Sequence, residues 1–447
     1  MSQYFDDEVI VIGLGYVGLT LSAFLANLGI KVHGVEIKKT ILSSLENHKA
    51  FFLEENLDDI LEVVIKNKKF TFSNSIPASQ NQRTFIITVG TPLTEYSTPN
   101  LIFIESAARE VANKINDGDF VILRSTVKLG TTNEVVRKIL DSSNKKYGLA
   151  FCPERTLEGA ALSEIGRLPQ IIGADNEKDL NRAAEFFNKV TTSVVVVSNI
   201  ETAEMIKLVD NMQRDTNFAI SNEVARMCNQ VNVKATEVIS AGKNKYPRTN
   251  LAMPGPVGGP CLEKDSYILN SSFDLPHSLS LTARIINESI IDDSLNLFKT
   301  YFGDRLNKNQ MDFKLAIIGL AFKGVPETND LRGSMALRMI MTVKNAFENI
   351  SIFGFDPVVL ENEINDLGIK STNNYEEAFE KSDLVLLMNN HPIITSINFS
   401  MMANKMKTGG MIYDYWNRLD DIRELPNQIT PASWGSHGVV FKGKLNG

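Results

Sequence analysis

The sequence predicts an α/β protein with two Rossmann-like parallel-sheet domains joined by a long central helical region. Three observations lead to this prediction. Short apolar segments alternate with helical patterns in both halves of the chain. A glycine-rich turn follows the first apolar segment, and a similar turn recurs shortly after Lys314. Between the halves, the stretch from Glu201 to about Val231 is helical in pattern and contains neither Gly nor Pro.

The first half opens with a predicted strand, Glu8–Ile12, that ends at Gly13-Leu14-Gly15-Tyr16-Val17-Gly18. A helical pattern then runs to Asn27, Gly29 ends it, and Lys31–Glu36 is the next predicted strand. Later apolar segments predict further buried strands at Phe85–Val89, Phe120–Leu123, Leu149–Cys152 and Val194–Val197. Helical stretches separate most of them, as in a parallel α/β sheet.

A second helical region, from about Ser278 to Tyr301, leads into the second half. There Leu315–Gly324 resembles Val9–Gly18, with Ala321 at the place of the middle glycine. A Cβ atom at that place hinders close approach to a pyrophosphate, so this half is expected to bind a different nucleotide, or to bind it differently. Strands are predicted at Ile350–Phe355, Leu384–Met388 and Met411–Tyr413. The expected domains are 1–200 for dinucleotide binding, 201–305 for the central helices and 306–447 for the second nucleotide fold.

Composition restricts the partners and the compartment. The chain has 447 residues and a net charge of −7 without a basic block, so neither nucleic acid nor an anionic membrane surface is an expected partner. Its three cysteines, Cys152, Cys228 and Cys261, cannot form a disulfide framework and fit a reducing compartment. The apolar stretch Val9–Ile30 follows acidic residues and does not read as a signal peptide. We therefore expect a cytoplasmic protein, and no metal site.

The first glycine turn carries a dinucleotide-binding pattern. Gly13, Gly15 and Gly18 lie between a predicted strand and a predicted helix, and Glu36 comes at about the expected spacing. The glycines allow a tight turn, and the helix N-terminus meets the pyrophosphate. Glu36 would accept hydrogen bonds from ribose hydroxyls and repel a 2′-phosphate, which favours NAD over NADP. Tyr16 and Val17, inside the same turn, are expected to contact the cofactor.

Cys261 lies in Gly258-Gly259-Pro260-Cys261-Leu262-Glu263-Lys264-Asp265. The glycines let the backbone approach a ligand closely, and a nearby lysine favours the nucleophilic thiolate. A free cysteine is more often a small buried hydrophobe. Together with a hydride acceptor, however, a thiol nucleophile indicates oxidation of an alcohol past the aldehyde through a covalent thioester.

Polar residues come directly after several predicted strands, where open α/β sheets bind ligands. They are Gly90-Thr91-Pro92, Ser125-Thr126 and Pro153-Glu154-Arg155-Thr156-Leu157-Glu158-Gly159. Each one alone could be turn chemistry. On the central helix, Lys207 and Asn211 are spaced i, i+4 and share one face.

Together these motifs resemble the UDP-glucose/GDP-mannose dehydrogenase family of NAD-dependent nucleotide-sugar 6-dehydrogenases. The resemblance runs nearly end to end and includes Phe322-Lys323 and Asp330-Leu331-Arg332. It implies oxidation of the C6 hydroxymethyl of a UDP-sugar to a carboxylate, with Cys261 forming a thiohemiacetal and then a thioester. It also implies a role in the synthesis of polysaccharide precursors and a homodimer, or a higher homo-oligomer, built on the central helices.

The resemblance assigns roles residue by residue. Thr126 and Asp265 would position water, Lys207 would stabilise negative charge at the C6 oxygen, and Asn211 would support that site. Glu154 and Glu158 would be the acid/base and cofactor-facing carboxylates. Which of the two carries the proton is left undecided. Implied NAD contacts are Thr91, Thr126, Glu158, Lys264 and Arg332. Implied UDP-sugar contacts are Glu154, Arg155, Lys207, Asn211, Arg248, Gly258, Phe322 and Lys323, with Arg248 in its own or a neighbouring subunit.

The motifs point to two sugars. The segments 153–159 and 211–215 look like the branch acting on UDP-N-acetylhexosamines, UDP-N-acetylmannosamine or UDP-N-acetylglucosamine. That branch usually has His before the cysteine and Val-Asp after it, whereas Pro260 precedes Cys261 here, and Lys264-Asp265 after it look like the glucose and mannose branches. We favour a UDP-N-acetylhexosamine and keep UDP-glucose as the alternative. Two other functions fit the sequence less well. A nucleotide-sugar sensor without catalytic activity would be expected to lose Cys261, Lys207 or Asp265, and all three are present. A hydroxyacid dehydrogenase that removes only two electrons needs neither the thiol nor residues 314–447.

Overall fold

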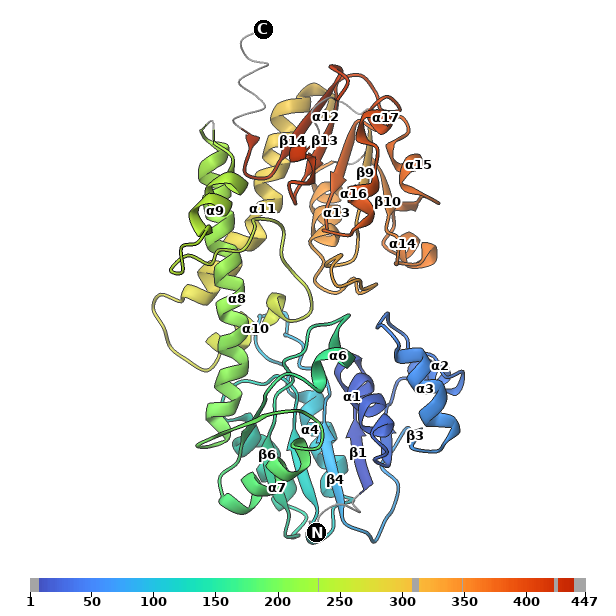
Figure 1. Ribbon diagram of the computed structural model, residues 1–447, viewed down its shortest axis with the longest axis vertical. Coiled ribbons are helices and arrows are strands. Elements are labelled where there is room, and N and C mark those ends of the chain that lie inside the picture. Colours follow the sequence, from blue (N-terminus) through green and yellow to red (C-terminus); the bar gives the residue numbers. More distant parts are fainter. Residues whose placement is uncertain (1–7, 232, 308–312, 348, 422–424, 438–447) are drawn as a thin grey trace. The chain divides into compact units, whose positions relative to one another are not determined.

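The computed structural model describes residues 8–231, 233–307, 313–347, 349–421 and 425–437. The chain divides into two compact units. The first comprises Met1–Asn211 and Lys264–Pro276, and the second comprises Met212–Glu263 and His277–Gly447. Each unit has a sheet of its own, labelled in Figure 1.

The first unit contains an eight-stranded sheet in the order β3-β2-β1-β4-β5-β6-β7-β8. The strands are β1 (Glu8–Ile12), β2 (Val32–Val35), β3 (Phe70–Ser73), β4 (Arg83–Ile87), β5 (Phe120–Leu123), β6 (Gly148–Phe151), β7 (Gln170–Gly173) and β8 (Val194–Val197). In β1, Val9 and Val11 join one hydrophobic cluster while Ile10 and Ile12 join another on the opposite face. Apolar residues at successive positions are expected when helices cover both faces of a sheet.

The helices of this unit supply the rest of both clusters. They are α1 (Tyr16–Asn27), α2 (Lys39–Glu46), α3 (Leu57–Lys66), α4 (Ile102–Ala112), the π-helix η1 (Thr132–Arg137), α5 (Lys138–Asp141), α6 (Ala161–Ile165) and α7 (Glu177–Phe187). Helix α1 ends as predicted, because Gly29 has φ +91° and its N–H bonds back to the Ala26 carbonyl at 2.9 Å. Helix α7 is capped at its N-terminus by Asn176, whose side chain accepts a hydrogen bond from the Asp179 N–H.

The sheet is largely parallel, as predicted. One pair is an exception, because β7 pairs with β6 in the antiparallel direction, and β8 then pairs with β7 in parallel. One prediction about this sheet was wrong. The segment Val194–Val197 is a strand but not a buried one, since Val195 and Val196 are 42% and 49% exposed. This strand is at the edge of the sheet, where one side has no neighbouring strand.

The second unit contains a six-stranded sheet in the order β11-β10-β9-β12-β13-β14, parallel throughout. Its strands are β9 (Lys314–Ile318), β10 (Ser351–Phe355), β11 (Lys370–Ser371), β12 (Leu384–Leu387), β13 (Gly410–Asp414) and β14 (Ile429–Ser433). Its helices are α9 (Ala235–Lys243), α11 (Leu279–Phe302), α12 (Asp304–Asn307), α13 (Met335–Ala346), α14 (Glu361–Asp366), α15 (Tyr375–Phe379), α16 (Ile393–Ser396), α17 (Phe399–Ala403) and the 3₁₀ turn η2 (Arg418–Asp421). Helices α8 (Ile200–Asn229) and α10 (Leu262–Asn270) contribute residues to both units.

The two glycine turns lead into different structures. In the first unit α1 begins at Tyr16, within the turn. After β9 the next helix, α13, begins only at Met335, with Ser334 as its N-cap. The N–H groups of Leu320 and Ala321 instead bond to the Asp356 carboxylate at 2.7 and 3.0 Å. The second turn therefore lacks a helix N-terminus, in line with its degenerate glycine pattern.

In the part of the chain that the structure describes, no helix combines the length and the apolar character needed to cross a bilayer. Within those same ranges, no group of His, Cys, Asp and Glu side chains is arranged to hold a metal ion.

Candidate active site

The first glycine turn combines a left-handed backbone at Gly13, a close contact at Gly18 and open space beside Gly15. Gly13 has φ +90°, a backbone conformation that favours glycine. A Cβ atom at Gly18 would lie 1.9 Å from the Gly13 carbonyl oxygen, so α1 can pack against β1 only with glycine there. A Cβ atom at Gly15 would meet nothing within 4 Å. The space beside Gly15, at the N-terminus of the twelve-residue helix α1, is the kind of cradle that a pyrophosphate occupies.

Glu36, just after β2, is buried against this turn. One carboxylate oxygen accepts the Leu14 N–H and the other accepts the Lys38 N–H, both at 2.9 Å. These bonds orient the carboxylate, and each oxygen keeps a lone pair for a ribose hydroxyl. The glycine turn and Glu36 therefore fit an NAD molecule.

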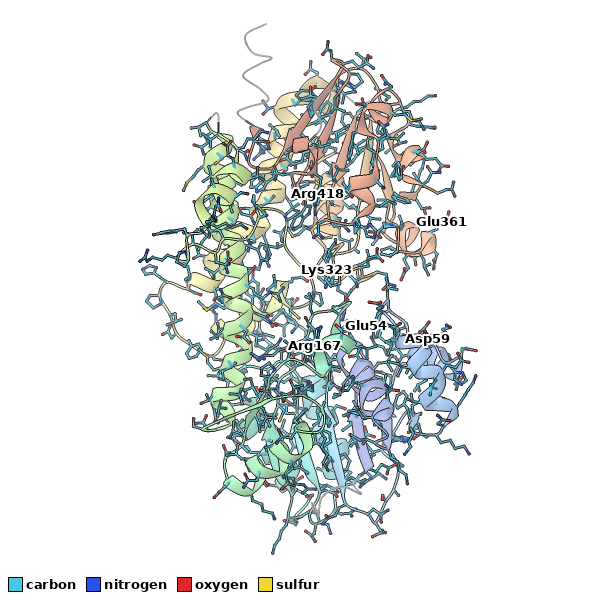
Figure 2. The ribbon with its side chains drawn as sticks, in the orientation of Figure 1. Glu54, Asp59, Arg167, Lys323, Glu361 and Arg418 are labelled. Atoms are coloured by element: carbon cyan, nitrogen blue, oxygen red, sulfur yellow. The ribbon has the colours of Figure 1, made fainter. Side chains whose placement is uncertain are left out.

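A second buried carboxylate, Glu54, links this turn to the segment around Glu158. Glu54 (labelled in Figure 2) accepts a hydrogen bond from the Tyr16 hydroxyl, from the Gly159 N–H at 2.9 Å and from the Leu162 N–H at 3.1 Å. Burial and Glu54 itself raise the pKa of Tyr16, so its hydroxyl stays protonated and donates. Glu54 thus holds the end of the predicted substrate segment close to the first residue of α1.

The loops after β4 and β5 are joined to each other. The Thr91 hydroxyl donates to the Thr126 carbonyl oxygen, and the Ser125 hydroxyl donates to the Val89 carbonyl oxygen at 2.6 Å. The structure therefore brings two of the predicted strand-end motifs together, as their positions in the sheet led us to expect.

The carboxylate of Glu154 is buried beside Arg124. Arg124 Nη2 lies 2.7 Å from Glu154 Oε2, and the N–H groups of Arg155 and Thr156 bond to Oε1 at 2.7 and 2.9 Å. Burial disfavours the charged form, but Arg124 and these hydrogen bonds outweigh it and hold the pKa of Glu154 below its usual value. Glu154 is therefore a carboxylate at neutral pH.

Lys207 and Asn211 lie on α8, and Asp265 on α10 belongs to the same unit. Asn211 Nδ2 donates to Asp265 Oδ2 at 2.5 Å, and Lys264 Nζ lies 3.0 Å from Asp265 Oδ1. Asn211 and Asp265 are buried, whereas Lys207 is half-buried. The structure thus unites three predicted site residues, Asn211, Lys264 and Asp265.

Glu204 lies one turn before Lys207 on the same helix and fastens α8 to the loop after β5. Its carboxylate accepts the Gly130 N–H at 2.7 Å, and the Thr132 N–H and hydroxyl at 3.0 and 2.6 Å. Burial raises the pKa of Glu204 to about 7, although these hydrogen bonds act in the opposite direction. Glu204 therefore titrates near neutral pH while it connects the helix of Lys207 to the loop that contains Thr126.

The predicted nucleophile belongs to the second unit. Of the three cysteines, all of them described, Cys261 is exposed, whereas Cys152 and Cys228 are buried. Burial raises the pKa of the Cys152 thiol to about 12, so that thiol stays neutral and unreactive. Helix α10 begins at Leu262, directly after Cys261. Cys261 is therefore accessible to a substrate, as a reactive role requires.

The other predicted contacts in this unit come from its loops. Phe322 and Lys323 are half-buried, and Lys323 Nζ lies 5.2 Å from the centre of the Phe322 ring. A Cβ atom at Gly259 would come within 2.5 Å of that ring, which places Phe322 against the glycines that precede Cys261. Arg332 pairs with Asp330 at 2.5 Å. Arg248 is exposed, and its guanidinium lies 5.6 Å from the Tyr246 ring centre.

Sequence reasoning missed Glu54, Arg124 and Glu204. Each is a charged residue of a common type, and its burial cannot be seen in the sequence. Arg124 directly precedes Ser125-Thr126, and Glu204 precedes Lys207 by three positions on α8. Their closeness to predicted site residues could have indicated Arg124 and Glu204. For Glu204 the reason is that residues three apart on a helix share a face.

The open N-terminus of α1 and the carboxylate of Glu36 are what a dinucleotide requires, and they define an NAD-dependent oxidoreductase. Comparison with known proteins identifies the family. Residues 7–191 match the NAD binding domain of the UDP-glucose/GDP-mannose dehydrogenase family, residues 201–289 its central domain and residues 316–421 its UDP binding domain. The chain belongs to this family and is an NAD-dependent UDP-sugar dehydrogenase.

Individual relatives agree with this assignment. The chain is 30% identical over 405 residues to a UDP-N-acetyl-D-mannosamine dehydrogenase of Pyrococcus horikoshii, covering 90% of this chain and 93% of the relative. It is 31% identical over 411 residues to the enzyme of the same name from Campylobacter jejuni, covering 88% and 96%. The solved structure of the Pyrococcus horikoshii UDP-D-ManNAc dehydrogenase superposes with a TM-score of 0.86 at 29% identity, over 97% of this chain and 100% of the other.

Two alanine substitutions test two different roles of the glycines. Gly15→Ala tests the ligand cradle, and Gly18→Ala tests the packing of helix α1. Gly15→Ala is expected to change the free energy of unfolding by less than about 0.5 kcal/mol, because its Cβ atom meets nothing. It should weaken NAD binding at least about tenfold by filling the cradle. Gly18→Ala should lose about 1–3 kcal/mol of stability through overpacking. Denaturant unfolding and NAD titration measure both, and equal NAD affinity in Gly15→Ala and the parent protein would contradict the assignment.

Glu204→Gln tests the titration near neutral pH. A carboxyl pKa raised on folding contributes stability that is present below the unfolded pKa of 4.5 and is lost as pH rises through about 7. At roughly 1.4 kcal/mol per pKa unit, the loss is about 3 kcal/mol. The parent protein should therefore lose stability relative to Glu204→Gln between pH 5 and pH 8 in denaturant unfolding. Glu201→Gln keeps an acceptor for Asn133 and removes the smallest of the contributions that raise the pKa of Glu204, so as the matched control it should keep most of the parent pH dependence.

Proposed function

We propose that the protein oxidises the C6 hydroxymethyl group of a UDP-N-acetylhexosamine to a carboxylate, with UDP-N-acetylmannosamine as the first candidate. The observation that carries this proposal is the similarity, over about nine tenths of both chains, to proteins named UDP-N-acetyl-D-mannosamine dehydrogenase. UDP-glucose is the second candidate, because Lys264-Asp265 after the cysteine resemble the glucose and mannose branches and Pro260 replaces the His usual in the N-acetylhexosamine branch. The product would be a UDP-uronic acid for polysaccharide synthesis.

The overall reaction removes four electrons. A primary alcohol, one water and two NAD⁺ become a carboxylate, two NADH and three protons, and bound NAD accepts one hydride in each oxidation. Between the oxidations the Cys261 sulfur adds to the aldehyde carbon and forms a C–S bond. Loss of the second hydride leaves a thioester, and attack by water breaks the C–S bond and restores the thiolate. Covalent attachment keeps the aldehyde from leaving.

The polar residues of the first unit support the oxygen atom at C6. Lys207 would stabilise negative charge on this oxygen in both oxidations. Asn211 and Asp265, joined at 2.5 Å, are suited to hold the hydrolytic water together with Thr126. Because Glu154 is ionised and paired with Arg124, it can accept a proton or a hydrogen bond but has no proton to donate at neutral pH. Glu158 is the other candidate carboxylate.

The binding residues are divided between the two halves of the chain. NAD would be held by the turn Gly13–Gly18 and by Glu36, with further contacts from Thr91, Thr126, Glu158, Lys264 and Arg332. The UDP-sugar would contact Arg155, Gly258, Phe322 and Lys323 besides the groups around C6, with Arg248 supplied by either subunit. The match of residues 316–421 to a UDP binding domain supports the second set.

We further propose the domain plan 1–200, 201–305 and 306–447, a homodimer formed through the central helices, and a cytoplasmic location without nucleic-acid or membrane partners. Ile220 and Met227 on α8 are 48% and 59% exposed, which supports an apolar contact between copies. The three cysteines, all in the described part of the chain, form no disulfide, as in a reducing compartment. Light scattering after size-exclusion chromatography measures the oligomeric state.

The yield of NADH per UDP-sugar tests the proposed reaction. With UDP-N-acetylmannosamine, UDP-N-acetylglucosamine or UDP-glucose limiting in turn, the true substrate should give two NADH. Cys261→Ala should abolish formation of the uronic acid, because the aldehyde can no longer be held as a thioester precursor. Cys228→Ala, a change at a buried cysteine, is the matched control and should still give two. Full acid formation by Cys261→Ala would exclude the covalent route.

A further inference from the structure

The thiol of Cys261 ends a long segment without regular structure. Helix α9 ends at Lys243 and α10 begins at Leu262, and no helix or strand lies between them. Backbone hydrogen bonds within such a loop are few, so its shape must be set by side chains that bond to its N–H and C=O groups. Among the described residues of the second unit, three side chains form such bonds, and none of them is conspicuous in the sequence.

Two asparagines of α8 each hold the loop at two points. Asn217 Nδ2 donates to the Asn250 carbonyl oxygen at 2.8 Å, and its Oδ1 accepts the Ala252 N–H at 2.9 Å. One turn further along the helix, Asn222 accepts the Gly255 N–H at 2.8 Å and donates to the Gly255 carbonyl oxygen at 3.1 Å. A side-chain amide that pairs with both groups of one residue fixes the direction of the chain as well as its position.

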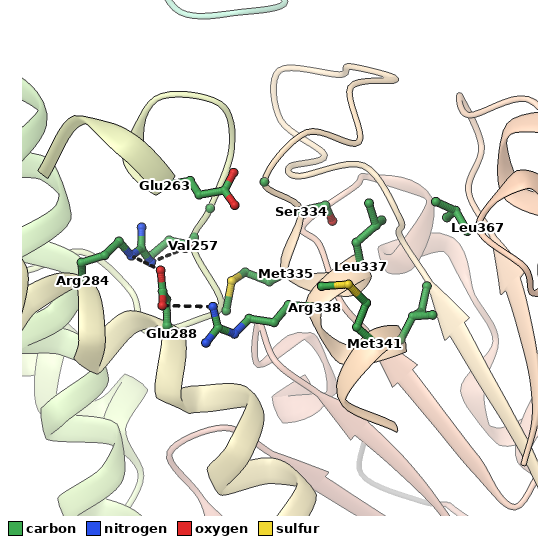
Figure 3. A pocket seen from close by; sticks show the side chains of 13 residues that line it. Val257, Glu263, Arg284, Glu288, Ser334, Met335, Leu337, Arg338, Met341 and Leu367 are labelled. Atoms are coloured by element: carbon green, nitrogen blue, oxygen red, sulfur yellow. Dashed lines mark hydrogen bonds and ion pairs between the residues drawn. The ribbon is translucent and has the colours of Figure 1, made fainter. Parts of the chain in front are cut away.

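Of these three side chains, Arg284 of α11 holds the loop nearest to the thiol. Its Nη2 donates to the carbonyl oxygen of Val257 at 2.8 Å, four residues before Cys261 (Figure 3). Arg284 is 1% exposed, and its Nη1 lies 3.1 Å from the equally buried Asp215 Oδ1. On its other side Nε lies 3.4 Å from Glu288 Oε1. Nη1 and Nε form no hydrogen bond in the described structure. The guanidinium is therefore held by its ion pairs with two carboxylates and by the Nη2 bond to Val257.

The cavity beneath the loop shows that packing alone does not hold this segment. A cavity of about 370 Å³ is lined by Val257 and Gly258 of the loop, by Arg284 and Glu288 of α11, and by residues of α13. The Gly259 N–H donates to the carbonyl oxygen of Gly333, which lines the same cavity, at 2.8 Å. Because the loop borders an open cavity, its hydrogen bonds carry more of its placement than they would in a filled core.

We propose that Arg284 is a positioning residue for the Cys261 nucleophile. Oriented by Asp215, its guanidinium holds the Val257 carbonyl and, together with Asn222 at Gly255, fixes the loop that carries the thiol. This inference rests on the proposed function of Cys261. The first oxidation needs no sulfur atom, whereas the aldehyde becomes a thiohemiacetal only if the sulfur reaches its carbon. A loosened loop should therefore impair the second oxidation selectively.

The test compares Arg284→Lys and Arg284→Met with Arg338→Met. Arg338 pairs with the other oxygen of Glu288 at 3.0 Å and lines the same cavity, but no bond joins it to the loop in the described structure. Displacement of a reacting group by about 1 Å can cost on the order of 10²-fold. Acid formation should fall about tenfold in Arg284→Lys and about a hundredfold in Arg284→Met, while Arg338→Met stays within about twofold.

The decisive readout is NADH per UDP-sugar in the presence of hydroxylamine, which traps free aldehyde. In both Arg284 variants the ratio should fall from two towards one, and the trapped sugar oxime should appear by mass spectrometry. Loss of active protein with the ratio still at two would show a merely structural role and overturn the proposal. So would unchanged kcat and stoichiometry in Arg284→Lys.

A second variant covers the case in which the Arg284 proteins do not fold. Asn222→Asp keeps the acceptor for the Gly255 N–H and removes the donor to the Gly255 carbonyl. It should shift the NADH ratio in the same direction, and an unchanged ratio would overturn the proposal. Carboxamidomethylation by iodoacetamide should label Cys261 in every folded variant, which shows that the thiol is present. Failure of the parent protein to give two NADH would instead count against the proposed function.

Discussion

The candidate site depends on one kind of interaction, in which buried side chains form hydrogen bonds to the backbone groups of loops. The functional segments of an α/β protein leave the sheet at strand ends, where N–H and C=O groups have no ladder partners. Buried polar side chains take the place of the ladder. Glu54 binds the N–H groups of residues 159 and 162, Glu204 those of residues 130 and 132, and Asn222 both groups of residue 255.

These side chains come from helices or stand next to them, so the loops take their precision from rigid elements. Helix α8 supplies Glu204 and Asn222 as well as Lys207 and Asn211. A carboxylate that supports a loop must itself be buried, and burial is costly unless hydrogen bonds or a counter-charge compensate it. Arg124 provides that charge for Glu154, which keeps the Glu154 carboxylate ionised. Glu204 has hydrogen bonds but no such partner among them, and its pKa rises to about 7.

Much of the fold could be predicted because the apolar strands are nearly continuous. The strands Glu8–Ile12, Phe120–Leu123 and Val194–Val197 have the predicted bounds, and α8 runs from Ile200 to Asn229 against a predicted start at Glu201. Strands with polar or proline residues were missed, among them Gln170–Gly173 and Ile429–Ser433. The antiparallel direction of β7 could not be predicted either, because strand direction depends on how the chain crosses the sheet.

The sequence by itself determined the chemistry-bearing motifs: the glycine turn with Glu36, the thiol of Cys261, and Lys207 with Asn211. These are recognisable because their chemistry needs particular residue types at short spacings along the chain. Tertiary structure alone decided which charged residues are buried and what they hold. Glu54, Glu204 and Arg284 are ordinary in sequence, and the backbone groups that they bind lie far along the chain, in loops without regular structure. Burial and pairing are properties of the folded chain, so no local pattern encodes them.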